Sequence, residues 1–147
     1  MYDASVAIHV VAAIIGFGAT FSYPVIQLVA ERRGLHAVAT GLETILTISR
    51  RVAVPASVMV GLTGIYQLID GPYSLGDPWL GAGFVLYLAV MVVAVAYLAP
   101  AYTRARAAAE RGSQTEYAAA IRGTRIVGPV LAAAIVAIAV LMEVKPS

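Results

Sequence analysis

Residues 4–30 read ASVAIHVVAAIIGFGATFSYPVIQLVA, a run of 27 positions without a formal charge. Roughly 20 apolar helical residues are enough to cross the hydrocarbon core of a bilayer. Three further stretches of the same kind follow, at 52–69, 79–103 and 126–142. These runs lack the alternation of barrel strands. The sequence therefore predicts an all-α membrane protein in which four transmembrane helices form a bundle.

The composition agrees with this class. Apolar residues make up 61% of the 147-residue chain and charged residues only 12%, which is far from the soluble average. The length predicts a single integral membrane domain over residues 1–147. The chain has no cysteine, so disulfides, thiolate metal sites and thiol catalysis are excluded. The segment Met1-Tyr2-Asp3 lacks the positive region of a signal peptide, and the first span is expected to stay in the mature protein.

The placement of arginine predicts the orientation of the bundle. All nine arginines lie in the first and third connections: Arg32, Arg33, Arg50, Arg51, Arg104, Arg106, Arg111, Arg122 and Arg125. Positive loops stay on the cytoplasmic side, so the N-terminus, the C-terminus and the 70–78 loop are predicted to face outward. The same placement explains the basic character of the chain without a nucleic-acid partner, and it makes the lipid bilayer the expected partner.

The connection from Glu31 to Arg51 carries a helical pattern of its own. Its apolar residues recur at steps of three and four: Leu35, Val38, Leu42, Ile45 and Leu46. This pattern predicts an amphipathic helix at or just below the inner membrane face, between the first and second spans. In the third connection, Gly112 suits a helix end, and Ser113 with Glu116 matches a capping box, so a tight helical hairpin is expected there.

Each span also holds one proline near its inner end: Pro24, Pro55, Pro100 and Pro129. Pro55 and Pro129 each follow an arginine by four residues, which fits two related helix hairpins. Prolines near helix ends are tolerated without any such relation, and this simpler interpretation is preferred.

Small residues at helical spacing predict the faces on which the helices touch. They form one stripe in the second span and two in the first: Ser57, Gly61 and Gly64; Ala12, Gly16 and Thr20; Gly18 and Ser22. His9 shares the stripe that contains Ala12. It is therefore expected to point into the bundle near its outer end, because an imidazole facing lipid is the costlier arrangement.

His9 is the candidate ligand for a cofactor or a metal. A neutral imidazole can ligate haem iron or copper or relay a proton, whereas a histidine that merely hydrogen-bonds a neighbouring helix is the simpler interpretation. His36 lies about 40 Å further along a helix, too far to share one iron within a subunit. A second ligand would come from His9 of another copy, or from Met142 or Lys145.

The outer ends of the spans bring several polar residues to a similar depth: His9, Tyr66, Gln67, Trp79, Glu143 and Lys145. Glu143 and Lys145 fit side chains that flank a helix end and reach water. No acidic or basic residue lies deep in a span, which argues against an ion-coupled carrier. Nothing resembles a catalytic triad or a phosphate-binding loop, so an enzyme is not favoured.

Several short motifs together resemble a known family. They are Ile8-His9-Val10, Pro55 followed by Thr63-Gly64, Pro78-Trp79, Pro100, and the C-terminal Met142-Glu143-Val144-Lys145-Pro146. This pattern is similar to a family of bacterial four-helix membrane proteins of unknown function, described as predicted integral membrane proteins. The resemblance covers essentially the whole chain and implies a multi-pass protein of the bacterial cytoplasmic membrane.

More distantly, the chain resembles the membrane-bound, haem-carrying protoporphyrinogen oxidase of bacteria and the copper-resistance D membrane domain. This likeness implies that His9 is a haem b or metal ligand and that Lys145 is functional. One departure concerns helix 3, where the oxidase relatives carry a lysine soon after a tryptophan. Here Trp79 is followed by Leu80-Gly81-Ala82-Gly83, which argues against the oxidase activity.

Three functional hypotheses follow. The first is a haem-binding or redox-accessory membrane protein that uses His9. The second is a structural or accessory subunit of a larger membrane complex, or a homo-oligomer, because small-residue stripes favour helix association. The third, a copper or small-solute permease, ranks last because few polar residues are available to line a path.

Overall fold

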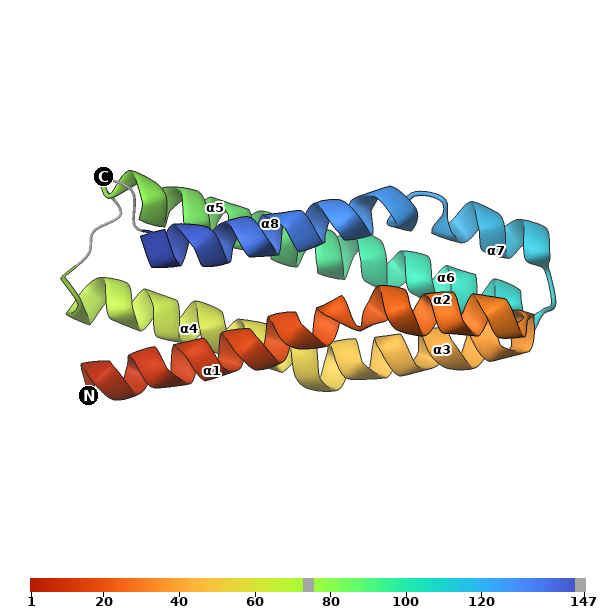
Figure 1. The fold of residues 1–147 in the computed structure, drawn as a ribbon, viewed down its shortest axis with the longest axis horizontal. Helices are drawn as coiled ribbons and strands as arrows, with labels where there is room; N and C mark the ends of the chain where they lie inside the picture. Colours follow the sequence, from red (N-terminus) through yellow and green to blue (C-terminus); the bar gives the residue numbers. More distant parts are fainter. Residues whose placement is uncertain (73–75, 145–147) are drawn as a thin grey trace.

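The computed structural model describes residues 1–72 and 76–144, and it is helical along nearly all of this length (Figure 1). Two of its elements, η1 and η2, are π-helical turns and the others are α-helices. In chain order the elements are α1 (Tyr2–Phe21), α2 (Tyr23–Arg33), α3 (Leu35–Ile48), η1 (Ser49–Ala53), α4 (Val54–Asp70), α5 (Pro78–Val93), η2 (Ala94–Leu98), α6 (Ala99–Glu110), α7 (Gln114–Ile121) and α8 (Thr124–Val144).

These elements join end to end into long rods. Within the described residues, four rods are long and apolar enough to cross a membrane: Tyr2–Arg33, Leu35–Asp70, Pro78–Glu110 and Gln114–Val144. The predicted all-α fold with four candidate spans is thereby confirmed. The rods contain 31 to 36 residues, which corresponds to about 45–55 Å of helix. A hydrocarbon core is only about 30 Å thick, so part of each rod has to extend beyond it.

The amphipathic segment forms a helix, α3, but this helix is not separate from the second span. It follows the Gly34 turn, where φ is +97°, and continues through η1 into α4 as one rod (Figure 1). Its apolar face packs against α2 and α6. The apolar periodicity that suggested a membrane surface therefore reflects packing inside the bundle.

Two rods change from α to π geometry just before their prolines. The turn Ser49–Ala53 precedes Pro55, and the turn Ala94–Leu98 precedes Pro100. A proline inside a helix donates no backbone hydrogen bond, and its ring collides with the carbonyl four residues earlier. The wider π turn relieves that collision without ending the helix.

The other two rods are interrupted by short turns near their prolines. In the first rod, a turn at Ser22 precedes Pro24, and the Ser22 hydroxyl donates to the carbonyl oxygen of Ala19 at 2.6 Å. In the fourth rod, the helix breaks at Arg122 and Gly123, before Pro129. There the Thr124 hydroxyl donates to the carbonyl oxygen of Ile121 at 2.8 Å. The Ser22 hydroxyl thus adds to the hydrogen bond of 3.2 Å that the Ser22 backbone N–H already donates to Ala19, and both hydroxyls bond locally to the backbone at the breaks.

The interruptions divide the bundle into two halves that pack differently. One half contains α2, α3, α6 and α7 and is called the inner half after the predicted orientation; in it a continuous core of buried side chains is centred on Leu42, Ile45, Ala105 and Ile121. In the outer half, α1 packs along α4 and α5 packs along α8. These two pairs meet through fewer contacts, including a hydrogen bond of 2.8 Å from the Tyr87 hydroxyl to the Ser57 carbonyl oxygen.

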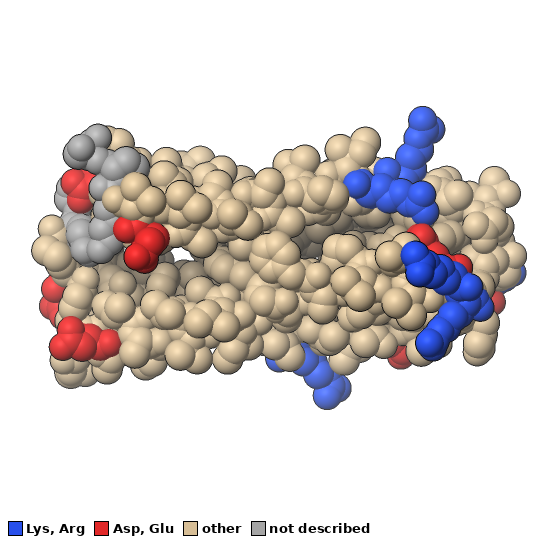
Figure 2. Space-filling model, in the orientation of Figure 1, with Lys and Arg blue, Asp and Glu red and all other residues tan. Residues whose placement is uncertain are grey.

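Exposed large apolar side chains are concentrated in the outer half, and they continue onto α2 of the inner half at Val25, Leu28 and Val29. They occur along the other helices, for example at Ile14, Leu62, Val85 and Val136, whereas α3, α6 and α7, which are described in full, carry none. Charged side chains gather toward the two ends of the bundle and leave a stretch between them uncharged. In Figure 2 acidic side chains cap the outer end, basic side chains lie toward the inner end, and a broad band without charge separates them. The acids of the outer end are Asp3, Asp70, Asp77 and Glu143.

The inner hairpin has the predicted caps. Gly112 adopts a positive φ of +72° after α6. The Ser113 side chain then accepts a hydrogen bond from the backbone N–H of Glu116 at the start of α7. Arg111 and Glu116 also form an ion pair across the turn.

Two of the three small-residue stripes lie at helix contacts. Ala12 and Gly16 are buried between α1 and α4, and Ser57 is buried on the facing side. The stripe through Gly18 was wrongly predicted as a contact face, because Gly18 is exposed and a Cβ atom there would meet nothing within 4 Å.

We expect Gly16→Leu to destabilise the protein relative to Gly18→Leu. A Cβ atom at Gly16 would lie 3.0 Å from the Cβ atom of Ala56 and 3.4 Å from the backbone nitrogen of Ser57, so a leucine forces α1 and α4 apart. Overpacking of this kind costs about 1–3 kcal/mol. Unfolding of the two variants in detergent measures the difference directly, because both gain the same helix propensity. Equal stabilities would show that α1 and α4 do not meet at Gly16.

Candidate functional site

His9 lies on the face of α1 that packs against α4. Its Nδ1 atom is 2.9 Å from the hydroxyl oxygen of Thr63. A Cβ atom at Gly64 would lie 3.5 Å from the Cε1 atom of the ring, an ordinary van der Waals distance, so the imidazole packs beside Gly64 of α4. The ring is half-buried. The prediction that His9 points into the bundle is confirmed.

The hydrogen bonds of Thr63 assign the tautomer of His9. The Thr63 hydroxyl lies 2.7 Å from the carbonyl oxygen of Met59 and 3.2 Å from that of Val60, and it donates its single proton there. Its oxygen is then left to accept a proton from Nδ1 of His9. With Nδ1 protonated in the neutral ring, Nε2 carries the free lone pair, and this is the atom with which an imidazole binds a metal or accepts a proton.

Of the other predicted ligands, Met142 lies in a different helix pair from His9. Met142, on α8, is half-buried, and its Cε atom would lie 2.8 Å from a Cβ atom at Gly83 of α5. His9 and Met142 therefore belong to different helix pairs. Lys145 lies outside the described residues. Within residues 1–72 and 76–144, no group of three or more His, Cys, Asp or Glu side chains could hold a metal ion.

The remaining residues of the outer end make separate local contacts. The Tyr66 hydroxyl donates to the Asp70 carboxylate at 2.7 Å, and the Gln67 side chain donates to the backbone carbonyl of Ser5 at 3.4 Å. Trp79 is buried at the start of α5, whereas Glu143 is exposed near the end of α8. Tyr66 and Gln67 thus hydrogen-bond partners other than His9.

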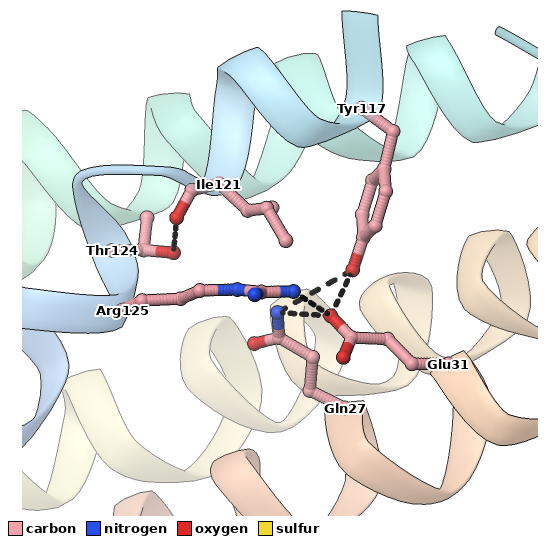
Figure 3. Close-up of polar contacts among 6 residues, drawn as sticks. All are labelled: Gln27, Glu31, Tyr117, Ile121, Thr124 and Arg125. Carbon is pink, nitrogen blue, oxygen red and sulfur yellow. Dashed lines mark hydrogen bonds and ion pairs between the residues drawn. The ribbon is translucent and has the colours of Figure 1, made fainter. Parts of the chain in front are cut away.

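A polar network in the inner half connects the first rod to the last (Figure 3). One carboxylate oxygen of Glu31, Oε1, accepts three hydrogen bonds. The Tyr117 hydroxyl donates at 2.6 Å, the Gln27 side chain at 3.1 Å and the Arg125 guanidinium at 3.2 Å. Glu31 and Gln27 come from α2, Tyr117 from α7 and Arg125 from α8. These four residues, called the Glu31 network below, join helices that are distant in sequence.

The burial of the Glu31 network indicates that it stabilises the fold. Tyr117 is 3% exposed, and the Glu31 side chain is 26% exposed. A partly buried carboxylate needs compensating donors, and here it receives two neutral donors and one cation. Hydrogen bonds to charged groups contribute about 1.5–3 kcal/mol. The network therefore fixes α2 against α7 and α8.

Sequence analysis missed the Glu31 network, although its spacing carried a signal. Gln27 and Glu31 are four residues apart, and Tyr117, Ile121 and Arg125 follow one another at the same step. In a helix, residues four apart lie on one face. The predicted connection begins at Glu31, which separates Glu31 from Gln27, the residue one helical turn before it.

Glu31 and Tyr117 form the shortest hydrogen bond of the Glu31 network, and replacing both should reveal that their contributions to stability are coupled. We expect Glu31→Ala and Tyr117→Phe each to destabilise the protein, and the double variant to lose about 1–2 kcal/mol less than the sum. Unfolding in detergent of the wild type, both single variants and the double variant measures this cycle. Glu110→Ala, which removes an exposed partner of Arg106 on α6, serves as the control with Tyr117→Phe. Additive losses in the first cycle would contradict the bond.

Comparison with known proteins identifies a family. No curated protein and no solved structure matches the chain. A family model described as "Predicted integral membrane protein (DUF2269)" matches residues 5–146, which is nearly the whole chain. This match confirms the predicted family, while the distant likenesses to the oxidase and to the copper-resistance domain stay predictions. The chain therefore belongs to the predicted integral membrane protein family DUF2269.

Proposed function

We propose that the bilayer surrounds the outer half of the bundle and that the inner half extends into the cytoplasm. Most of the exposed apolar side chains favour this depth, since they lie on α1, α4, α5 and α8, and those at Val25, Leu28 and Val29 extend the apolar surface onto α2. The arginines, which all lie at or beyond the inner ends of these segments, favour a cytoplasmic inner half and outward termini. Such a protein belongs in a bacterial cytoplasmic membrane.

Cysteine labelling in intact cells tests this orientation, and the natural chain contributes no background because it has no cysteine. We expect Asp3→Cys to react with a membrane-impermeant maleimide from outside. Ser113→Cys, at the inner hairpin, should react only after the membrane is permeabilised. The reverse pattern would overturn the proposed orientation.

We further propose that the protein binds haem through His9 and acts as a redox-accessory membrane protein. The observation that carries this proposal is the hydrogen bond between Nδ1 of His9 and Thr63. It orients the ring through Nδ1, as a hydrogen bond to the second ring nitrogen commonly does in metal-binding histidines. In the proposed position of the bilayer, His9 lies in the outer part of the membrane.

The residues around His9 fit a haem that is held by one protein ligand. His9 offers one nitrogen, and its ring is held on the α4 side by Thr63 and packs beside Gly64. Met142 packs on α5, in the other helix pair. When bound, haem would supply one-electron chemistry. The residues of this chain would hold it, orient the imidazole and exclude water.

Titration of the detergent-purified protein with haem tests this role. We expect a shift of the Soret band that saturates at a fixed ratio of haem to protein and that His9→Ala abolishes. His36→Ala removes the other histidine, which is exposed on α3, and should titrate like the wild type. If His9→Ala binds haem as the wild type does, the proposal fails.

The hydrogen bond from His9 can be tested in the same titration. Thr63→Val removes the acceptor, and loss of such an orienting partner typically weakens ligand affinity by roughly 10–100-fold. Thr44→Val is the matched control, because Thr44 also donates to the carbonyl four residues earlier but is exposed on α3. Unchanged affinity in Thr63→Val would show that the tautomer of His9 does not matter for binding.

A further inference from the structure

We propose that a pocket at the break between α7 and α8 binds the headgroup of an anionic phospholipid. The pocket has a volume of about 160 Å³ and is called the basic pocket below. It is lined by Gln114, Tyr117, Ala118, Ile121, Arg122 and Arg125. The inference is independent of any ligand on His9. It rests on the proposed orientation of the bundle in the bilayer, which cysteine labelling tests separately.

The helix break creates the basic pocket. Tyr117 and Ile121 lie one turn apart on the inward face of α7, where both are buried. The chain then turns at Arg122 and Gly123 before α8 begins at Thr124. Figure 3 shows the Arg125 side chain running from α8 beneath Ile121 toward Tyr117.

The charges of the basic pocket favour an anion. The Nη2 atom of Arg125 donates to Glu31 at 3.2 Å, which holds the guanidinium in place, yet the Arg125 side chain is 62% exposed and keeps further donors open. Arg122 is exposed, and within the described part of the chain it makes no hydrogen bond or ion pair. Glu31 thus offsets one of the two positive charges. Guanidinium groups match the oxygens of a phosphate through paired hydrogen bonds.

The surroundings of the basic pocket select a lipid rather than a soluble phosphate. Exposed apolar side chains begin on α8 directly after the pocket, with Ile126 70% exposed and Val130 59% exposed, whereas α7 carries none. A phospholipid has an anionic headgroup beside two apolar chains. Its headgroup would occupy the basic pocket while its chains cover Ile126 and Val130. Basic pockets at the cytoplasmic ends of membrane helices are suited to such lipids.

Lipid binding to the detergent-purified protein tests the proposal. Native mass spectrometry with added phosphatidylglycerol measures an apparent Kd, and phosphatidylcholine of the same chain length measures the contribution of the chains alone. We expect preferential retention of phosphatidylglycerol. Inorganic phosphate should compete only weakly, because it lacks the chains.

Three variants separate the basic pocket from a general effect of charge. Arg122→Gln and Arg125→Gln should each weaken phosphatidylglycerol binding by about fivefold, the amount expected for one basic residue at a membrane surface. Arg33→Gln removes the same charge at the far end of α2 and should bind as the wild type. Arg122→Gln is the decisive variant, since its side chain does not take part in the Glu31 network.

Glu31→Gln provides a test with the opposite sign. It removes the negative charge beside Arg125, so phosphatidylglycerol should bind about fivefold more tightly even though the fold is destabilised. A purely structural role of the arginines predicts no such gain. The proposal is overturned if Arg122→Gln binds as Arg33→Gln does, if both lipids are retained equally, or if phosphate alone displaces phosphatidylglycerol at equal concentration.

Discussion

In the proposed position of the bilayer, each rod of this bundle meets two solvents along one helix, and the different packing of the two halves follows from that constraint. In hydrocarbon a backbone must satisfy its hydrogen bonds internally, which keeps the rods helical, but apolar side chains gain nothing by turning inward. In water the reverse holds, and a helix needs a buried apolar face. The outer half accordingly exposes Ile14, Leu62 and Val136, whereas the inner half buries Leu42 and Ile45.

The prolines lie near the boundary between these two regimes. A straight helix fixes the angular relation between its two ends, yet α4 has to face α1 while α3 faces α2 and α6. The π turn before Pro55 gives the rod a local adjustment between these demands. The turn at Ser22 and the break at Gly123 have the same place in their rods. His9 of α1 and Thr63 of α4 meet in the outer half, away from the buried core of the inner half.

The sequence predicted the features that depend on one helix at a time. Charge-free runs predicted the rods, and Ser113 with Glu116 predicted the cap of α7. The predictions failed where burial in lipid and burial in protein require the same apolar stripe. The stripe of α3 fits a membrane surface as well as a protein core. For His9, the inward direction was predictable from its stripe. Its partner Thr63 was not, because the register between α1 and α4 is set by close contact at Gly16 and Ser57.

The Glu31 network has a consequence for how the protein is made. Glu31 precedes Tyr117 by 86 residues and Arg125 by 94, so its partners leave the ribosome only when most of the chain has been synthesised. Until then the first two rods emerge with the Glu31 carboxylate lacking both donors. Closure of the bundle is thus coupled to insertion of the final rod. A chain truncated before Tyr117 would lack both residues, Tyr117 and Arg125, through which the last rod is hydrogen-bonded to Glu31 of the first rod.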